Sequence, residues 1–437
     1  MGGQVSLLRF PRSGGPVQAF DPDSLGHPTW ISLGSIPPIR RVLGADLGER
    51  LAWAIDAAGA PVSVDLEARS TRKLPDLGAA AAVVGPDGSL YVAGPNRRVV
   101  RVARRTPVQF HDTLPEPPRA LFGGMNELVV AVTGNRRPRL VTSNPDQIVY
   151  STVIPPGEVE ASYWGDLLAV AADSAVYLYE TLGRRPLGTI RSSHHARDVV
   201  FSPSAHRLYV AGDDPGVLIY DRFTLQQVGR IELPAAPRAI RMSASGRWLL
   251  ARPATDSVWV VDLSTNRPVG AVAGEWGVDL PLVAGAATLV VRQQTEVASF
   301  DLRQVPPRRI AALKGGGDDL WLAAAWVPRE RLPAAVAQVE SASVAQDSAL
   351  VADSSRLAPD STIIYLQVSS SQNRDWSEDL AKQLKEGGFP ATVIERQGEE
   401  EGFRVVVGPY PTEDAAVEAG RKLGRPYFVL RLPPRRP

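Results

Sequence analysis

The feature that most constrains the fold of this chain is an internal repeat of about 40 residues in its first three quarters. The clearest pair of copies runs from Arg197 to Val272. Each copy contains four short segments that are rich in β-branched residues, alternate between apolar and polar positions, and are separated by turn residues. This pattern predicts four β-strands per copy. The repeat therefore predicts a series of small four-stranded sheets, each of which needs its neighbours to cover its apolar faces.

The two ends of the repeat region complete each other. The same frame gives seven complete units from Ile39 onwards, the residues before Ile39 match only the last three strands of a unit, and residues 319–328 match only a first strand. Pairing the two fragments would close the array into a ring and leave no sheet edge exposed. The sequence therefore predicts an all-β propeller over residues 1–328, with eight blades, one of them composite. A seven-bladed ring is the alternative, because the unit boundaries near Pro118 and Glu158 depend on weak matches.

Two phrases in the fifth and sixth units carry a resemblance to known propellers. Y-V-A-G begins at Tyr209, and D-x-x-T-x-x-x-V occurs at Asp221 and again at Asp262. These phrases resemble the YVTN-type and WD40-like propeller repeats. The resemblance implies the fold and no particular activity, since propellers serve both in binding and in catalysis.

The composition changes after the repeats. Residues 329–360 are rich in Ala, Ser, Val and Asp and contain neither Gly nor aromatic residues. A segment of this kind buries too little apolar surface to order itself, so we expect a flexible linker. The alternative is a helix that lies on the propeller, because a partial stripe of valines recurs at helical spacing.

A different periodicity marks residues 361–437 as a second domain. The segments alternate between strand and helix patterns in the order β-α-β-β-α-β. They are expected at residues 361–371, 374–388, 390–396, 401–410, 412–424 and 426–432. This order predicts a small α+β ferredoxin-like domain with both helices on one face of the sheet and the other face uncovered.

Two motifs in this domain resemble the SPOR (sporulation-related repeat) family. They are LQVSSS at residues 366–371 and FRVVVGPY at residues 403–410. The resemblance implies binding to peptidoglycan, and specifically to glycan strands that have lost their stem peptides. It implies glycan contacts for Gln367, Ser370, Arg404 and Leu430. The chain departs from the family pattern at Ser369, where the family has Gly, and at Ser371, where it has an aromatic residue.

Strand alternation adds two residues to this predicted site. Side chains two apart on a strand share a face, so Ser369 is expected beside Gln367, and Val406 beside Arg404, on the uncovered face. Amide, hydroxyl and guanidinium groups there suit sugar hydroxyls, acetamido groups and carboxylates. Phe403 falls on the apolar side and is expected in the core. The alternative is that Gln367 and Arg404 are simply solvated surface residues.

Composition and missing motifs limit the other functions. The chain has 48 Lys and Arg against 47 Asp and Glu, so no basic excess favours nucleic acid. There are no cysteines and only five histidines, and the common hydrolase, metalloprotease and nucleotide-binding motifs are absent. The adjacent His194 and His195 favour a surface loop over a metal or base site. We therefore expect no catalytic residues, no metal and no cofactor.

These observations lead to one favoured function and one alternative. The favoured function is a non-catalytic cell-envelope protein that binds denuded glycan strands and presents its propeller to an unknown protein partner, at the division septum. The alternative is a lactonase-like or hydrolase-like propeller enzyme that the C-terminal domain localises to the cell wall. Neither a transmembrane segment nor an export signal is visible. Because the periplasm or cell envelope is expected, the chain would then be a mature or truncated form.

Overall fold

The computed structural model divides the chain into two compact units, Met1–Arg329 and Glu330–Pro437. It describes residues 5–30, 32–46, 50–86, 88–103, 106–124, 127–181, 185–192, 195–326, 363–371, 374–386, 388–396, 402–412, 415–416, 419–420 and 428–432. The predicted linker, residues 329–360, lies outside the described residues. No described helix is long and apolar enough to span a membrane.

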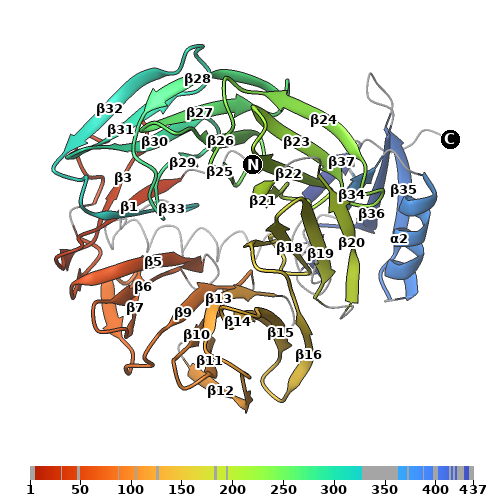
Figure 1. The fold of residues 1–437 in the computed structure, drawn as a ribbon, viewed down its shortest axis with the longest axis horizontal. Helices are drawn as coiled ribbons and strands as arrows, with labels where there is room; N and C mark the ends of the chain where they lie inside the picture. Colours follow the sequence, from red (N-terminus) through yellow and green to blue (C-terminus); the bar gives the residue numbers. More distant parts are fainter. Residues whose placement is uncertain are drawn as a thin grey trace, which may run out of the picture. The chain divides into compact units, whose positions relative to one another are not determined.

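The first unit is a propeller of antiparallel sheets arranged around a centre (Figure 1). Seven of its sheets have four strands, and in each of them the strands pair in the order of the chain. The unit starts predicted near Ile39, Pro118 and Glu158 coincide with the first residues of β5, β13 and β17. The strands of the seven sheets are β5 (Ile39–Asp46), β6 (Leu51–Asp56), β7 (Pro61–Asp65) and β8 (Ser70–Lys73); β9 (Ala81–Val84), β10 (Leu90–Ala93), β11 (Arg98–Ala103) and β12 (Thr106–Thr113); β13 (Pro118–Gly123), β14 (Val129–Thr133), β15 (Arg139–Ser143) and β16 (Ile148–Val153); β17 (Glu158–Ala161), β18 (Leu167–Ala172), β19 (Ala175–Glu180) and β20 (Arg185–Arg191); β21 (Ala196–Phe201), β22 (Arg207–Gly212), β23 (Gly216–Asp221) and β24 (Gln227–Glu232); β25 (Ala239–Met242), β26 (Trp248–Arg252), β27 (Ser257–Asp262) and β28 (Arg267–Ala273); and β29 (Leu282–Ala284), β30 (Thr288–Gln293), β31 (Glu296–Asp301) and β32 (Arg308–Lys314).

An eighth, composite sheet joins the two ends of the propeller. β33 (Leu320–Ala324) pairs with β1 (Ser6–Phe10), which pairs in turn with β3 (Gln18–Phe20). Backbone hydrogen bonds between Ala19 and Trp30 continue this sheet outwards, and a small separate ribbon is formed by β2 (Gly15–Pro16) and β4 (Ser35–Ile36). The predicted eight-bladed ring with one split blade is therefore confirmed in its strand pairing.

Apolar contacts hold the composite blade on both sides. One buried cluster combines Leu8 and Leu320 with Val62 of the following blade, and another combines Leu7 and Trp321 of the composite blade with residues of the preceding one. Second strands such as β18 are buried along their whole length because blades cover both of their faces. The outer strand β24 is mostly exposed, and Ile231 is its one buried residue, as expected for the outermost strand of a blade.

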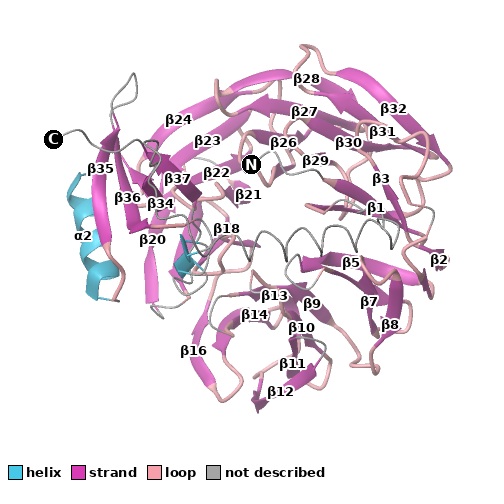
Figure 2. Ribbon diagram, turned by 180° about the vertical axis from the view of Figure 1, so that it is seen from behind, coloured by secondary structure: helices cyan, strands magenta, loops and turns pink. Residues whose placement is uncertain are grey.

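The second unit contains one four-stranded antiparallel sheet and a helix packed on it. The strand order is β35–β36–β34–β37, the order of a ferredoxin-like sheet. The elements are β34 (Ile363–Ser371), α2 (Arg374–Glu386), β35 (Ala391–Arg396), β36 (Gly402–Tyr410) and β37 (Phe428–Leu432). Figure 2 separates α2 by colour from the strands that make up the propeller. Most of the predicted second helix, residues 412–424, lies outside the described residues.

Candidate functional site

Helix α2 determines which face of the C-terminal sheet is apolar. Leu380 and Leu384 on α2 pack with Leu366, Val405 and Val407, and all five side chains are buried. Phe403 also lies towards the helix, where the Arg374 guanidinium is 5.9 Å from the centre of its ring. The expectation that the apolar side of these strands meets the helix holds for these residues.

The opposite face, which we call the polar face, carries Gln367, Thr392 and Arg404. In the register of the sheet, Gln367 lies opposite Val406, and Val406 lies opposite Thr392. These three positions form a row that crosses the sheet perpendicular to its strands. Among the described residues, the side chains of Gln367 and Arg404 make no hydrogen bond or ion pair, so these polar groups can bind a ligand.

A β-bulge interrupts the alternation of β34 at this face. The pairing of β34 with β36 shifts between Gln367 and Ser369, so that Ser369 lies opposite Val405 and Ser370 lies opposite Arg404. Strict alternation predicts Ser369 on the same face as Gln367, and the extra residue in β34 interrupts this alternation, so the face of Ser369 stays a prediction. Ser370 takes the register position beside Arg404.

Two more predicted residues lie in this sheet with different exposure. Leu430 is partly exposed and pairs with Tyr365. Val406 has no exposed surface, so its side chain offers nothing for a sugar to contact. The proposed site therefore does not include Val406.

The backbone conformation explains the glycine of the second motif, Gly408. Gly408 has a φ of +136°, which side chains with a Cβ rarely adopt, and a Cβ there would lie 3.1 Å from the Tyr365 ring. The chain therefore needs Gly at this position to bring β36 close to β34.

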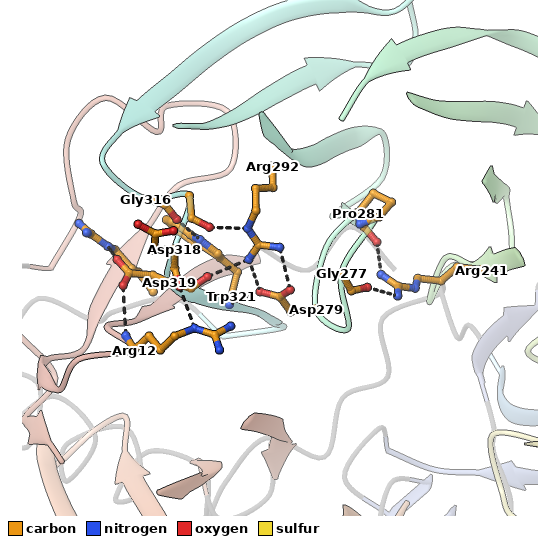
Figure 3. Close-up of polar contacts among 12 residues, drawn as sticks. Arg12, Arg241, Gly277, Asp279, Pro281, Arg292, Gly316, Asp318, Asp319 and Trp321 are labelled. Atoms are coloured by element: carbon orange, nitrogen blue, oxygen red, sulfur yellow. Dashed lines mark hydrogen bonds and ion pairs between the residues drawn. The ribbon is translucent and has the colours of Figure 1, made fainter. Parts of the chain in front are cut away.

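In the propeller, charged side chains of the inner strands bind backbone groups of the next blade. A carboxylate oxygen of Asp198 accepts a hydrogen bond of 2.8 Å from the Ile240 backbone N–H. Arg241 donates to the Pro281 carbonyl at 2.6 Å and to the Gly277 carbonyl at 2.9 Å (Figure 3). Such contacts join one blade to the next at the centre of the ring, and we call them the inner seam.

The inner seam is densest at the composite blade. Asp279 binds both terminal nitrogens of Arg292, at 3.2 and 2.9 Å, and accepts a 2.9 Å hydrogen bond from the Trp321 backbone N–H. Arg292 also donates to the Asp319 carbonyl, and the Asp319 carboxylate binds Arg9 at 2.6 Å. Figure 3 shows this network between the last complete blade and the strand that closes the ring. The network fixes β33 in place from both of its neighbours.

Two carboxyl groups near the centre of the propeller have pKa values above their ordinary range. Burial raises the pKa of Glu160 to about 8, the nearby Asp198 raises it further and Arg241 opposes the shift. Burial also raises the pKa of Asp198 to about 6, against the lowering effect of hydrogen bonds from the Ile240 and Val199 backbone. At neutral pH Glu160 is therefore mostly protonated.

The histidines lie apart from these groups. His27, His111 and His195 are exposed, and His206 packs against the Phe223 ring, with ring centres 5.5 Å apart. His194 lies outside the described residues. In the part of the chain that the structure describes, no three His, Asp or Glu residues are grouped so that they could hold a metal ion.

Comparison with known families decides what the C-terminal sheet is. Residues 360–429 match the SPOR domain family. The chain ends in a SPOR domain. A SPOR domain implies peptidoglycan binding and a location in the cell envelope. The polar face of this SPOR domain carries the Gln and Arg of its two motifs.

A solved structure supports the fold of the first unit. The structure of apo AztD from Citrobacter koseri has a TM-score of 0.54 and 11% sequence identity, and the match covers 73% of this chain and 97% of that one. The β-propeller domain of Cps50 (Swd1) from Myceliophteria thermophila has a TM-score of 0.41 and 14% identity, covering 61% of this chain and 94% of that one. At these identities the likeness to AztD shows the fold alone. A comparison with curated proteins finds no match.

Sequence reasoning missed the inner seam, although a signal for it exists. Arg40, Arg119, Asp198, Arg241 and Asp279 each bind the backbone of a residue 38 to 42 positions later. A charged residue that recurs at the repeat period near an otherwise apolar first strand is unusual, and could have been recognised as a contact between blades.

Proposed function

We propose that this protein is a non-catalytic component of the cell envelope that binds glycan strands stripped of their stem peptides, through the polar face of its SPOR domain. The observation that carries the proposal is the arrangement of Gln367, Arg404 and the register position of Ser370 on one face, in the two motifs that resemble the family. An amide and a guanidinium without internal partners among the described residues can bind sugar hydroxyls and acetamido groups directly.

The propeller has a different part in this proposal. It presents a protein-interaction surface near the septal glycan that the SPOR domain holds. The sequence lacks the signature motifs of common hydrolases, which supports a binding role for the propeller. Tethering to glycan would raise the effective concentration of the propeller near partners that it binds weakly.

A double substitution tests the glycan site. In Gln367→Ala/Arg404→Ala we expect co-sedimentation with amidase-treated sacculi to be lost or strongly reduced, because each lost hydrogen bond costs about 1–3 kcal/mol. The matched control is Gln227→Ala/Arg308→Ala, which removes the same residue types from exposed positions on the outer strands β24 and β32. Equal binding of both variants, with unchanged thermal unfolding, would refute this site.

A further inference from the structure

A cavity lies on the other side of the SPOR sheet, between helix α2 and the edge strand β35. Its volume is about 380 Å³. Ala381, Val393 and Phe403 give it an apolar wall, and charged side chains of α2 together with polar residues of β35 line the rest. It lies on the face opposite Gln367 and Arg404, so it is separate from the site proposed above.

The charged side chains that line this cavity differ in whether they have an ion-pair partner. Arg374 binds Glu378 at 2.8 Å and approaches Glu395 at 3.7 Å, so the two carboxylates that line the cavity already have a cation. Lys382 and Lys385 also line it, are exposed, and take part in no ion pair with any described residue. Since they are three residues apart on a helix, both ammonium groups lie on the same side of α2. The cavity therefore offers two cations to an anionic ligand.

The cavity reaches around the edge of the sheet to the polar face. Thr392 and Val393 are neighbours on β35 and point to opposite faces of the sheet, yet both line the cavity. Thr392 ends the row that begins at Gln367 and passes over Val406. Two strand spacings separate Gln367 from Thr392, about 10 Å. Thr392, which is exposed, therefore lies where the polar face meets the cavity at the edge of the sheet.

We propose that the cavity binds the free lactyl carboxylate of an N-acetylmuramic acid residue in the glycan strand, with Lys382 and Lys385 as its cationic partners. This inference rests on the proposed function and adds a reason for the choice of denuded strands. In intact peptidoglycan the lactyl carboxyl group is bound to the stem peptide as a neutral amide. Amide cleavage releases a carboxylate, the charge that two ammonium groups recognise. The apolar wall at Phe403 and Val393 would contact the lactyl or acetyl methyl group.

The test compares two soluble ligands on the full chain by calorimetry. One is a denuded glycan oligosaccharide, and the other is a chitin oligosaccharide of equal length, which has acetamido groups but no carboxylate. Lys382→Ala/Lys385→Ala should lower the affinity for the denuded glycan about tenfold or more and leave the affinity for chitin unchanged. Lys382→Arg/Lys385→Arg should retain binding, and Lys314→Ala, at an exposed position on β32, controls for charge.

The outcomes separate this inference from the proposed function. If Gln367→Ala/Arg404→Ala loses binding and the lysine variant binds like the wild type, the cavity assignment is wrong and the polar face stands. Equal affinity of the wild type for both oligosaccharides would also overturn the cavity assignment. If the wild type binds neither ligand, the proposed function itself is wrong.

Discussion

The propeller and the SPOR domain use their polar side chains in opposite ways. In the propeller, Asp198, Arg241 and Asp279 bind backbone groups of the next blade. In the SPOR domain, Gln367 and Arg404 have no such partner among the described residues. The difference teaches that a charged residue in a repeat can hold the ring closed by binding the next blade. A polar residue on a sheet face that has no hydrogen-bond partner within the protein is the better candidate for ligand binding.

The largest expected effect is on closure of the propeller. Arg292 is 11% exposed and Asp279 is 6% exposed, so Arg292→Ala leaves a buried carboxylate without its cation. We expect the free energy of unfolding of the propeller to fall by about 3–5 kcal/mol. The control is Arg303→Ala. Arg303 is 68% exposed and pairs with Asp301, so its loss should lower the free energy of unfolding by at most about 1 kcal/mol.

Chemical denaturation of both variants measures this difference, with co-sedimentation on sacculi as a second readout. Arg292→Ala should unfold at lower denaturant concentration while its binding to sacculi is retained, because the SPOR domain does not contain this network. Equal losses of stability in the two arginine variants would show that the inner seam does not hold the ring closed.

A second effect is on how the stability of the propeller depends on pH. The pKa of Glu160 is raised to about 8 and that of Asp198 to about 6, so the folded state holds protons that the unfolded state releases near pH 4. The contribution of these two groups to the free energy of unfolding is fully present at low pH. It is lost as the pH rises towards 8, by about 1.4 kcal/mol per pH unit for each proton that the folded state holds. Asp56, Asp221 and other carboxyls with lowered pKa values act in the opposite direction at acidic pH, so the useful window is pH 5 to 8.

Urea denaturation across this window tests the assignment. Glu160→Gln should flatten the loss of stability between pH 5 and pH 8, because the amide does not ionise. Glu116→Gln, at an exposed position, should follow the wild-type curve. A wild-type midpoint that is constant or rises over the window would contradict the raised pKa of Glu160.

The fold was predictable from the sequence because the same strand pattern recurs in every repeat. Four-strand units recur at a constant period, so the starts at Ile39, Pro118 and Glu158 and the pairing of β33 with β1 follow from the frame. The site was less predictable because it depends on single events. One shift in register between Gln367 and Ser369 interrupts the alternation of side chains along β34, and no residue type in the sequence predicts such a bulge.

The cavity beside α2 shows a second limit of the sequence. The spacing of Lys382 and Lys385 is visible in the sequence, yet whether they have partners depends on where Glu378 and Glu395 lie. Arg374 takes both carboxylates, through one contact within α2 and one with β35. Only the three-dimensional arrangement shows that the lysines are left for a ligand.

The most direct test of the account is binding of the full chain to purified sacculi before and after amidase treatment. Amidase removes stem peptides and leaves denuded strands, so we predict a clear increase in co-sedimented protein after treatment. Muramidase digestion of the same treated sacculi should release the protein again. Equal or weaker binding after amidase treatment would contradict the central claim that this SPOR domain selects denuded glycan.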